Sequence, residues 1–483
     1  MYIKWSIFIL YCSGMLYIGW LGYKRTKSTS DYFVAGRTLG IWVAVPLFAA
    51  GFFSAASVVG QSAVAYKEGW SYFVIYPVGL ALGWVLLAII APKFSRVKKP
   101  WITTADMFAD RYYSPKVIRG LLAVFLLLNM SLLVIQGLTG AGAILSAYLN
   151  ISYELAVILM GIVFVVYTAF GGMFSVSWTN VVQFLLLFFA VGFSALFGIA
   201  KSGGLSNLSV LLYEVDPNLL TATFGGKYNI SYIVGTILTL ALGCPILIYY
   251  HRMFFSCRSD RVAVGMIGYG AVGLALCYLG ILFIGLTARA ILPTELVDSE
   301  GVFTALVNTM NPVVGAVVIS GVIAALQSSV DNQLLSASSV ASSDLYKKII
   351  NPEGSDEWVM KVSMWTTLII GTICVVVAYF RPATIIQLYI FNTSLGVGVI
   401  FAPMVLGLYW SRTTKEAGIF GVIFGFFGTI LWIAFGIKTI PPALIILPAN
   451  IIIMVIISLN TAKPPQSVTD TFFNNFNKER LKA

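Results

Sequence analysis

The stretch from Ala324 to Tyr346 (AALQSSVDNQLLSASSVASSDLY) places hydroxyl groups and a carboxylate directly after a long apolar run. On an α-helix, Ala325, Ser328, Ser329 and Asn332 fall at positions i, i+3, i+4 and i+7, so they share one face. Two adjacent hydroxyls and a backbone carbonyl are oxygen ligands of the kind that a hard cation such as Na⁺ takes. The alternative is that these small residues only let neighbouring helices pack closely.

The carboxylate in this stretch, Asp331, lies one turn after Ser328 and near the edge of the same face. A carboxylate at membrane depth costs ~2.5–3.5 kcal/mol on the insertion scale, so such residues usually line a polar pathway. The alternative is a long helix in which Asp331 already lies near the end. The serines that follow are expected to serve packing: Ser336, Ser338, Ser339, Ser342 and Ser343.

A possible partner for this helix lies in residues 49–66 (AAGFFSAASVVGQSAVAY). Glycines and serines at Gly51, Ser54, Ser57 and Gly60 weaken a regular helix. A locally unwound segment would expose backbone carbonyls that can bind an ion where they line a cavity. An ordinary, tightly packed helix with small residues explains the same pattern, and the two readings stay open.

A third polar stretch runs from Gly171 to Gln183 (GGMFSVSWTNVVQ). The glycine pair indicates a tight turn, and Ser177 and Thr179 bring polar groups to the start of the helix that follows. Asn180 and Gln183 are one turn apart, so they can face the same cavity.

Composition identifies the medium that surrounds these groups. The chain has 483 residues, of which 59% are hydrophobic and 10% charged, with a mean hydropathy of +0.91. A water-soluble fold could not bury that much apolar surface. The five scattered cysteines suggest neither a disulfide framework nor a metal site, and the single histidine, His251, excludes a histidine cluster. His251 is expected at a membrane edge, beside Arg252.

The net charge of +11 does not point to nucleic acid, because the basic residues lie in short loops between apolar runs. Thirteen runs meet the length of ~20 residues that a membrane span needs. They cover residues 3–23, 39–66, 70–92, 116–147, 151–170, 174–200, 230–250, 262–288, 312–340, 359–379, 384–410, 415–436 and 441–460. The first run lacks a cleavage site and is expected to remain as a span. Residues 101–112 are expected to form a short amphipathic segment at the surface.

The basic residues also predict the orientation. With the amino terminus outside, 23 of the 30 lysines and arginines fall on the inner side. Since cytoplasmic loops are enriched in lysine and arginine, an outside amino terminus and a cytoplasmic carboxyl terminus are expected in a plasma membrane.

Two of the polar stretches, residues 171–183 and the serine-rich run of the ninth span, resemble the sodium:solute symporter family, which includes proline, pantothenate and glucose transporters. GGMFSVSWTNVVQ is similar to the family's signature, and SSDLYKK, DYFVAGRTLG and VLGLYWSRTTKEAGIFG also resemble family members. The resemblance covers nearly the whole chain and implies an all-α fold with about thirteen spans and the leucine-transporter-type core of five plus five inverted helices.

The resemblance also implies a domain layout and an ion site. Residues 1–483 would form one transmembrane domain, with core repeats at about 39–200 and 230–410 and peripheral helices at 3–23, 415–436 and 441–460. Spans two, three, seven and eight would form a bundle that rocks against the rest. The implied ligands of Na⁺ are the carbonyls of Ala50, Phe53 and Ala325 and the hydroxyls of Ser328 and Ser329.

The chain departs from the family at Asn180, where most members carry an aspartate tied to coupling or to a second cation. Asp331, with Asn332 beside it, is therefore expected to take over more of the cation or proton coupling. The alternative is that the second ion is absent.

The implied function is Na⁺-coupled symport of a small organic solute by alternating access. The solute cavity is expected beside the break in the second span, and its candidate lining residues are Ser54, Ser57, Gln61, Tyr76, Asn129, Gln136, Tyr249 and Asn392. Sugar-transporting members carry an acid and an amide where this chain has Ala56 and Ser57, which disfavours a hexose. The middle of the fourth span lacks an arginine, which disfavours a sialic-acid clamp. A small amino acid such as proline, or a monocarboxylate such as a pantothenate-like acid, is expected.

Other functions agree less well with the sequence than symport does. A sodium-coupled sugar symporter would share the same ion site. A channel would need a continuous polar pore, whereas the polar residues here concentrate in a few spans. A sensor would need a signalling module, and the polar tail after residue 461 is short. An enzyme is not expected, because no arrangement of cysteine, histidine and aspartate supports catalysis. The partners are therefore a solute, Na⁺ and the lipid bilayer, without nucleic acid.

Overall fold

The structure is a computed structural model that describes residues 2–97, 99, 101–292, 299–435 and 442–474. These residues form helices joined by short loops, and they contain no β-strand beyond one isolated bridge between Leu39 and Cys257. The long helices are α1 (Tyr2–Arg25), α5 (Ser71–Arg96), α7 (Val117–Leu149), α8 (Tyr153–Lys201), α12 (Asp260–Ile291), α15 (Asp356–Tyr379), α18 (Lys415–Ala434) and α19 (Pro442–Asn460), and of these α8 is kinked at Gly172. The all-helical membrane fold is thereby confirmed.

Other apolar segments are interrupted or change their helical pitch. They are α3 (Ile41–Phe52) with η2 (Ala56–Gly60) and α4 (Gln61–Glu68); α10 (Ile230–Gly243) with α11 (Ile248–Ser256); α14 (Pro312–Ser339) with η5 (Val340–Ile350); and α16 (Ile385–Gly396) with η6 (Val397–Phe401) and α17 (Ala402–Tyr409). The short elements are α2 (Thr29–Val34), η1 (Ala35–Arg37), α6 (Thr104–Arg111), α9 (Leu205–Val215), η3 (Pro217–Leu220), η4 (Ser299–Gly301), α13 (Val302–Val307), α20 (Gln466–Thr469) and η7 (Asp470–Asn474).

Within the described residues, eleven helices are long and apolar enough to cross a membrane, and the bent pair of α3 and η2–α4 makes twelve. The predicted count of thirteen is not confirmed by this number. The difference lies in α8, whose 49 residues at ~1.5 Å each exceed the ~30 Å of hydrocarbon in a bilayer. Gly172, with φ of 59° and ψ of −167°, interrupts α8 where the sequence predicts the turn between two spans.

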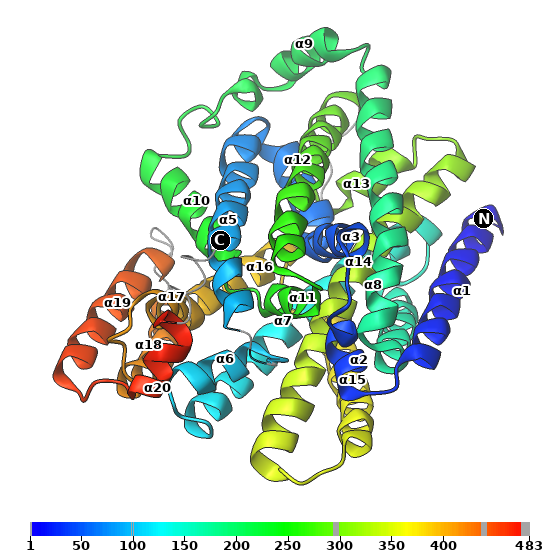
Figure 1. Ribbon diagram of the computed structural model, residues 1–483. Helices are drawn as coiled ribbons and strands as arrows, with labels where there is room; N and C mark the ends of the chain where they lie inside the picture. Colours follow the sequence, from blue (N-terminus) through cyan, green and yellow to red (C-terminus); the bar gives the residue numbers. More distant parts are fainter. Residues whose placement is uncertain (1, 98, 100, 293–298, 436–441, 475–483) are drawn as a thin grey trace.

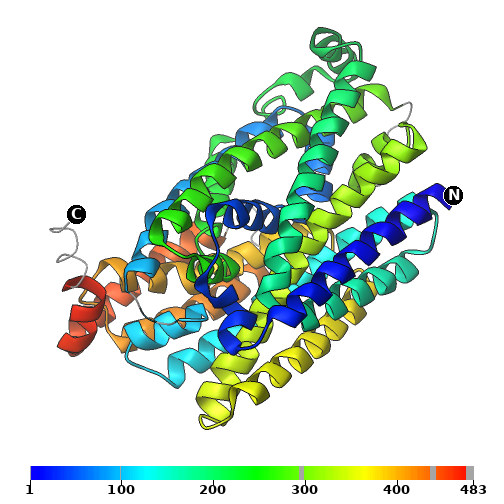
Figure 2. The ribbon, with the colours of Figure 1, turned by 45° about the vertical axis from the view of Figure 1, so that its right-hand side comes forward.

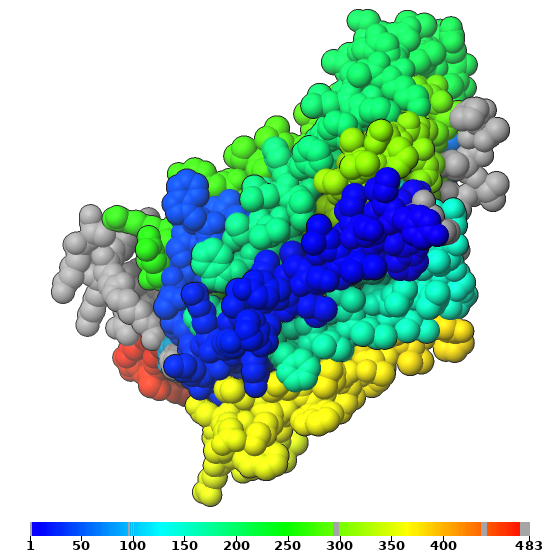
Figure 3. Space-filling view, turned by 90° about the vertical axis from the view of Figure 1, so that its right-hand side faces the viewer, coloured from blue at the N-terminus to red at the C-terminus, as the bar shows by residue number. Residues whose placement is uncertain are grey.

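The helices run roughly alongside one another, and α14 lies at the centre (Figures 1 and 2). In the most apolar 18-residue segment of α14 with η5, 83% of the residues are buried inside the protein. In the corresponding segments of α1, α15, α18 and α19, only 28–33% of the residues are buried. The space-filling view shows α1 lying across the surface of α8 (Figure 3). The peripheral helices can therefore face lipid, and the polar stretch of α14 is enclosed by protein.

Two segments expected at the surface or the membrane edge are buried within the protein. The segment expected at the surface does contain a helix, α6, but seven of the eight α6 residues are buried. His251 and Arg252, expected at the edge, lie in the middle of α11 and are 0% and 2% exposed. Thr104 of α6 and Phe94 of α5 enclose His251. Five of the basic residues on which the predicted orientation depends lie outside the described residues, namely Lys98, Lys438, Lys478, Arg480 and Lys482.

Candidate functional site

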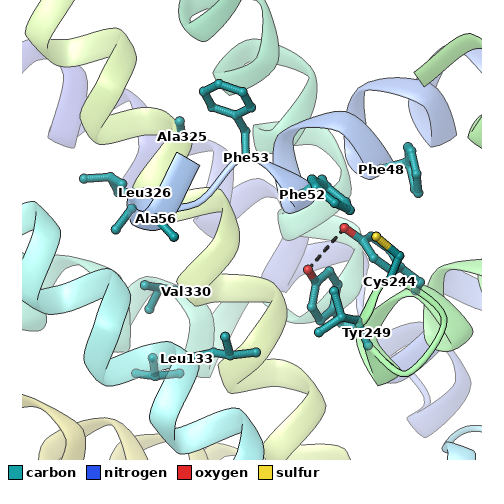
Figure 4. Packing of buried hydrophobic residues seen from close by; sticks show 14 of the residues in the cluster. Phe48, Phe52, Phe53, Ala56, Leu133, Cys244, Tyr249, Ala325, Leu326 and Val330 are labelled. Atoms are coloured by element: carbon teal, nitrogen blue, oxygen red, sulfur yellow. Dashed lines mark hydrogen bonds between the residues drawn. The ribbon is translucent and has the colours of Figure 1, made fainter. Parts of the chain in front are cut away.

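The break that follows α3 lies directly against α14 (Figure 4). Helix α3 ends at Phe52, and Phe53 has extended backbone angles of φ −82° and ψ 96°. The amide of Ser57, which would bond the Phe53 carbonyl in a regular helix, donates instead to the carbonyl of Ser54 at 2.9 Å. The Phe53 carbonyl is thereby released from the helix, as the unwound reading of residues 49–66 predicts.

The two serines of α14 meet these carbonyls. The Ser328 hydroxyl oxygen lies 2.8 Å from the carbonyl oxygen of Ala50 and 2.7 Å from that of Ala325. The Ser329 hydroxyl oxygen lies 3.1 Å from the Phe53 carbonyl and 3.3 Å from that of Gly51. The structure therefore brings together the five residues that the resemblance implies as sodium ligands, and it adds Gly51.

The oxygens in this group outnumber the hydrogens available to them. Each serine hydroxyl carries one hydrogen and lies within hydrogen-bonding distance of two carbonyl oxygens. A hydroxyl can donate its hydrogen to only one of these carbonyl oxygens. The other carbonyl oxygen then faces a lone pair of the serine oxygen, and the two repel each other. A small cation among these oxygens would remove that repulsion, and the donor set of neutral hard oxygens suits an alkali ion. The described residues hold no group of three or more histidine, cysteine, aspartate or glutamate side chains that could bind a metal.

Asp331, one turn further along α14, is fully buried. One of its carboxyl oxygens, Oδ1, accepts a hydrogen bond of 2.8 Å from the hydroxyl of Thr168 on α8. The other oxygen, Oδ2, has no protein hydrogen-bond partner. A buried carboxylate without a compensating positive charge is costly, so this oxygen is suited to a cation or a proton.

Other buried polar atoms on α1, α8 and α14 are also unpaired. The Nε2 of Gln183 on α8 lies 3.8 Å from the sulfur of Met15, and its Oε1 has no protein hydrogen-bond partner. Tyr11 on α1 donates to Oε1 of Gln327 at 2.5 Å, which leaves Nε2 of Gln327 unpaired. Asn180 donates to its own helix, at the carbonyl of Val176, and its Oδ1 is unpaired. Because buried polar groups are normally paired, this cluster has unused binding capacity.

Asn332 links α14 to the buried end of α11. Its amide nitrogen donates to the carbonyl of Ser328 at 2.8 Å. Its backbone and side-chain oxygens accept from Nη2 of Arg252 at 3.0 and 3.2 Å. Asn332 thus joins a serine of the oxygen group to a fully buried guanidinium.

A second group of polar atoms lies on α7 and α16. Asn129 Nδ2 donates to Asn392 Oδ1 at 2.8 Å, which leaves Asn129 Oδ1 and Asn392 Nδ2 without protein partners. Gln136, two turns further along the same face of α7, has an unpaired Nε2. This face approaches the break in the second span, since a Cβ on Gly140 would lie 2.5 Å from Cβ of Ala55. A Cβ on Gly396 of α16 would likewise meet Ile246 in the α10–α11 break, at 2.2 Å.

The remaining predicted solute residues are dispersed around the breaks. Ser57 bonds the hydroxyl of Tyr278 at 2.9 Å, and its Oγ accepts from the amide of Ser54 at 3.4 Å. Gln61 Oε1 accepts from the hydroxyl of Tyr72 at 2.9 Å. The hydroxyl of Tyr249 lies 3.2 Å from that of Tyr250 (Figure 4).

Of the eight predicted solute residues, Tyr76 alone lines the cavity that reaches toward the break from the α4 end. This cavity has a volume of about 670 Å³. It is lined by Gly60, Ala63, Val64, Lys67, Glu68, Tyr76, Tyr232, Ser299, Glu300, Arg381, Ala383, Thr384, Ile386, Gln387 and Ile390.

Sequence reasoning missed several polar partners of these groups. Gln327 was detectable, because it precedes Asp331 by one turn and shares its helix face. Tyr11, Thr168 and Tyr278 lie on other spans, and no local pattern marks them as partners of these groups. The burial of Arg252 against Asn332 of α14 is equally hidden from the sequence.

Comparison with known proteins agrees with this architecture. Residues 32–425 match the model of the sodium:solute symporter family. The chain is 28% identical over 475 residues to the high-affinity proline transporter PutP of Bacillus subtilis, covering 95% of this chain and 98% of that protein. It is 25% identical over 495 residues to the sodium/proline symporter of Haemophilus influenzae, covering 96% of each.

Two solved structures share the fold. The substrate-bound outward-open state of a Na⁺-coupled sialic acid symporter has a TM-score of 0.79 at 21% identity, with 95% of this chain and 98% of that chain covered. Mhp1, a nucleobase-cation-symport-1 family transporter in a closed conformation, has a TM-score of 0.60 at 14% identity, with 93% and 96% covered. On the family match and the membrane-spanning fold, the chain belongs to the sodium:solute symporter family and is a transporter that couples the movement of a small organic solute to Na⁺.

Proposed function

We propose that this protein takes up a small amino acid, with proline as the first candidate, and that a monocarboxylate or pantothenate-like acid is the alternative cargo. The names of the relatives support proline, since the matched proteins of B. subtilis and H. influenzae are proline transporters. The observation that carries the proposal is the contact of two serine hydroxyls on α14 with four carbonyls, three of them at the end of α3.

Sodium binds, in this proposal, among the carbonyls of Ala50, Phe53 and Ala325 and the hydroxyls of Ser328 and Ser329. These ligands come from two helices, so the ion favours the arrangement in which α14 and the α3 break lie together. Because the solute cavity adjoins the same break, each ligand strengthens the binding of the other. A membrane potential of 100 mV then supplies ~2.3 kcal/mol for each charge that moves.

The solute lies, in this proposal, between the α3 break and the polar face formed by Asn129, Gln136 and Asn392. The Asn129–Asn392 pair leaves one acceptor and one donor unused. An amino acid matches this combination, since its ammonium can donate to Asn129 Oδ1 and its carboxylate can accept from Asn392 Nδ2. A sugar would rely on acidic and amide side chains that this chain lacks beside Ser57.

Asp331 is the proposed second coupling group, with Asn180 and Asn332 beside it. Its free carboxyl oxygen and the unpaired oxygens of Asn180 and Gln183 are all acceptors, which suits a cation or a proton in transit. Asp331 thereby compensates for the absence of an acid at position 180.

The proposed arrangement in the plasma membrane has the amino terminus outside, with the core repeats at about 39–200 and 230–410. The large cavity is lined by Lys67 and Arg381, which lie on the side that carries few basic residues. The cavity would then open outward, and α6 and α11 would close the inner side.

The test is uptake by purified protein in proteoliposomes, with an imposed inward gradient of Na⁺ or of choline. L-proline, other small amino acids, monocarboxylates, pantothenate and hexoses are compared as radioactive solutes. Saturable proline uptake that requires Na⁺ supports the proposal. Uptake of a hexose but not of proline would select the sugar alternative, and a solute-independent conductance would select a channel.

A further inference from the structure

The single histidine of the chain, His251, uses both of its ring nitrogens to join two separate elements. It is fully buried. Its Nδ1 lies 2.8 Å from the hydroxyl of Thr104 in α6, and its Nε2 lies 2.8 Å from the carbonyl oxygen of Pro245. Its ring stacks on Phe94 of α5, with centroids 4.3 Å apart and planes inclined by 26°.

The partners of His251 determine where the hydrogens lie. A carbonyl oxygen can only accept, so Nε2 carries the hydrogen that is donated to Pro245. In the neutral ring, Nδ1 is then an acceptor, and the Thr104 hydroxyl donates to it. Both bonds are satisfied by one neutral tautomer, so the histidine functions here as a connector.

One end of this connection, α6, is fixed firmly to the rest of the protein. A capping box between Thr103 and Asp106 begins the helix. Arg111 at its other end is fully buried and donates to the carbonyls of Gly407, Trp410 and Thr413, at 2.5, 2.9 and 3.1 Å.

Asp106 provides a second attachment for α6. Its Oδ1 accepts from Arg119 of α7 at 2.6 Å and from Lys348 of η5. Burial alone would raise the pKa of Asp106, but Lys348 and Arg119 together hold that pKa below its usual value. The carboxylate therefore stays charged, and α6 stays attached to α7 and η5.

The other end of the connection is the break between α10 and α11. Pro245 lies inside this break, which spans Cys244 to Leu247. The neighbouring residue, Ile246, packs against Gly396 of α16, four residues after Asn392 in the proposed solute site. His251 therefore spans from α6 to the segment that borders the solute.

We propose that His251 is a positioning residue that ties the solute-side break of the seventh span to α6, so that the break cannot rearrange without opening the inner side. This proposal rests on the proposed transport cycle and orientation, with the expected rocking of the bundle that contains the seventh span, and therefore α11, against the rest of the protein. When the Thr104–His251 bond breaks, the inner end of α11 is freed and the Pro245 carbonyl loses its fixed partner. The bond thus favours the state that is closed on the inner side.

The experiment measures the inner-side opening through a native cysteine. Cys257 follows α11 and is half-buried, whereas Cys12, Cys244, Cys277 and Cys374 are buried. A membrane-impermeant maleimide added to inside-out vesicles reports the labelling rate of Cys257, with Cys257→Ser as the blank. The matched pair of variants is Thr104→Val, which keeps the shape and loses the donor, and Thr104→Ser, which keeps the hydroxyl.

The expected result is a rate about threefold to tenfold higher for Thr104→Val, the shift that loss of one buried hydrogen bond produces, and an unchanged rate for Thr104→Ser. His251→Gln, which keeps an amide donor for Pro245 and loses the acceptor for Thr104, gives a similar increase. The double variant of His251→Gln and Thr104→Val is no faster than Thr104→Val alone, because both changes remove the same bond.

Transport supplies the readout that a merely structural role would not change. Thr104→Val raises the KM for external solute by no more than the factor by which it raises the labelling rate of Cys257. The Vmax per folded molecule is retained. Equal labelling of Thr104→Val and Thr104→Ser, or additive effects in the double variant, would overturn the proposal. Labelling needs no solute, so its outcome is separate from the identity of the cargo.

Discussion

The hydroxyl oxygen of Ser329 lies 3.1 Å from the carbonyl oxygen of Phe53, 276 positions earlier in the chain. The contact exists because Phe53 lies in a break, where its carbonyl has no intrahelical donor. It joins α14, whose apolar window has the largest buried share among the candidate spans of the described residues, to a helix pair that is bent by 56° at its break. A cation held at this contact would stabilise one relative position of the two helices, which is what coupling requires.

The coupling role of Asp331 predicts a difference between two exchanges. Asp331→Asn removes a fully buried acid that has one unpaired carboxyl oxygen, so the solute gradient that the protein sustains should fall. Loss of one coupled charge at 100 mV corresponds to ~2.3 kcal/mol, or about fiftyfold in accumulation. The measurement is the steady-state accumulation ratio in proteoliposomes held at a fixed potential.

Asn180→Asp is the companion variant, and it restores the acid that most of the family carries at this position. We expect it to be tolerated, with accumulation close to that of the unchanged protein. Full accumulation by Asp331→Asn together with failure of Asn180→Asp would contradict the assignment.

The proposed solute site predicts a selective loss of solute affinity. Asn129→Ala and Asn392→Ala should each raise the KM for the solute about tenfold to hundredfold, as expected for a lost hydrogen bond to a charged group. The Na⁺ concentration for half-maximal activation at saturating solute should change little. Uptake kinetics measured over both concentrations give the two constants.

Thr139→Val is the matched control on the same helix, because the Thr139 hydroxyl donates to the α7 carbonyl of Ile135 at 2.8 Å. It should leave the solute KM unchanged. A solute KM that is equally affected by Thr139→Val, or unaffected by either asparagine variant, would place the solute elsewhere.

The kink in α8 predicts a strong preference for glycine at position 172. Gly172 has a positive φ, and a Cβ there would lie 2.9 Å from Cδ2 of Tyr32. Gly172→Ala should therefore cost about 1–3 kcal/mol of strain and displace Asn180 and Gln183 from Asp331. Thermal unfolding of the purified protein measures the loss.

Gly192 provides the comparison within the same helix, since nothing lies within 4 Å of a Cβ there and its φ is not positive. Gly192→Ala should be neutral or slightly stabilising, because alanine is the better helix former. If both variants unfold at the temperature of the unchanged protein, the kink does not depend on glycine.

The sequence predicted much of the fold because membrane spans have a length and composition that need no tertiary information. Small residues around Gly51 and Ser54 made a break in the second span one of two open readings, and the glycine pair before Met173 indicated the kink in α8. The pairing of Ser328 with Ala50 came from the resemblance to a family, since spacing along one helix does not reveal which other helix lies opposite.

Other features could not be predicted because they depend on packing between distant elements. The position of His251 next to Arg252 suggests a membrane edge, whereas Thr104 of α6 and Phe94 of α5 enclose it within the protein. Thr168 reaches Asp331 from another helix, and its local sequence does not reveal that partner. The two predicted spans on either side of Gly172 follow each other through a kink and are counted as one helix, α8, which is why the span count differs.

The most direct test of the sodium site is binding of radioactive Na⁺ to the purified protein without solute, compared with the double variant of Ser328→Ala and Ser329→Ala. Ser328→Thr with Ser329→Thr, which keeps both hydroxyls, is the control. Loss of two oxygen ligands, each worth about 1.5–3 kcal/mol, should weaken binding at least hundredfold, while the threonine variant binds. Unchanged Na⁺ affinity in the double alanine variant would contradict the site between α14 and the α3 break.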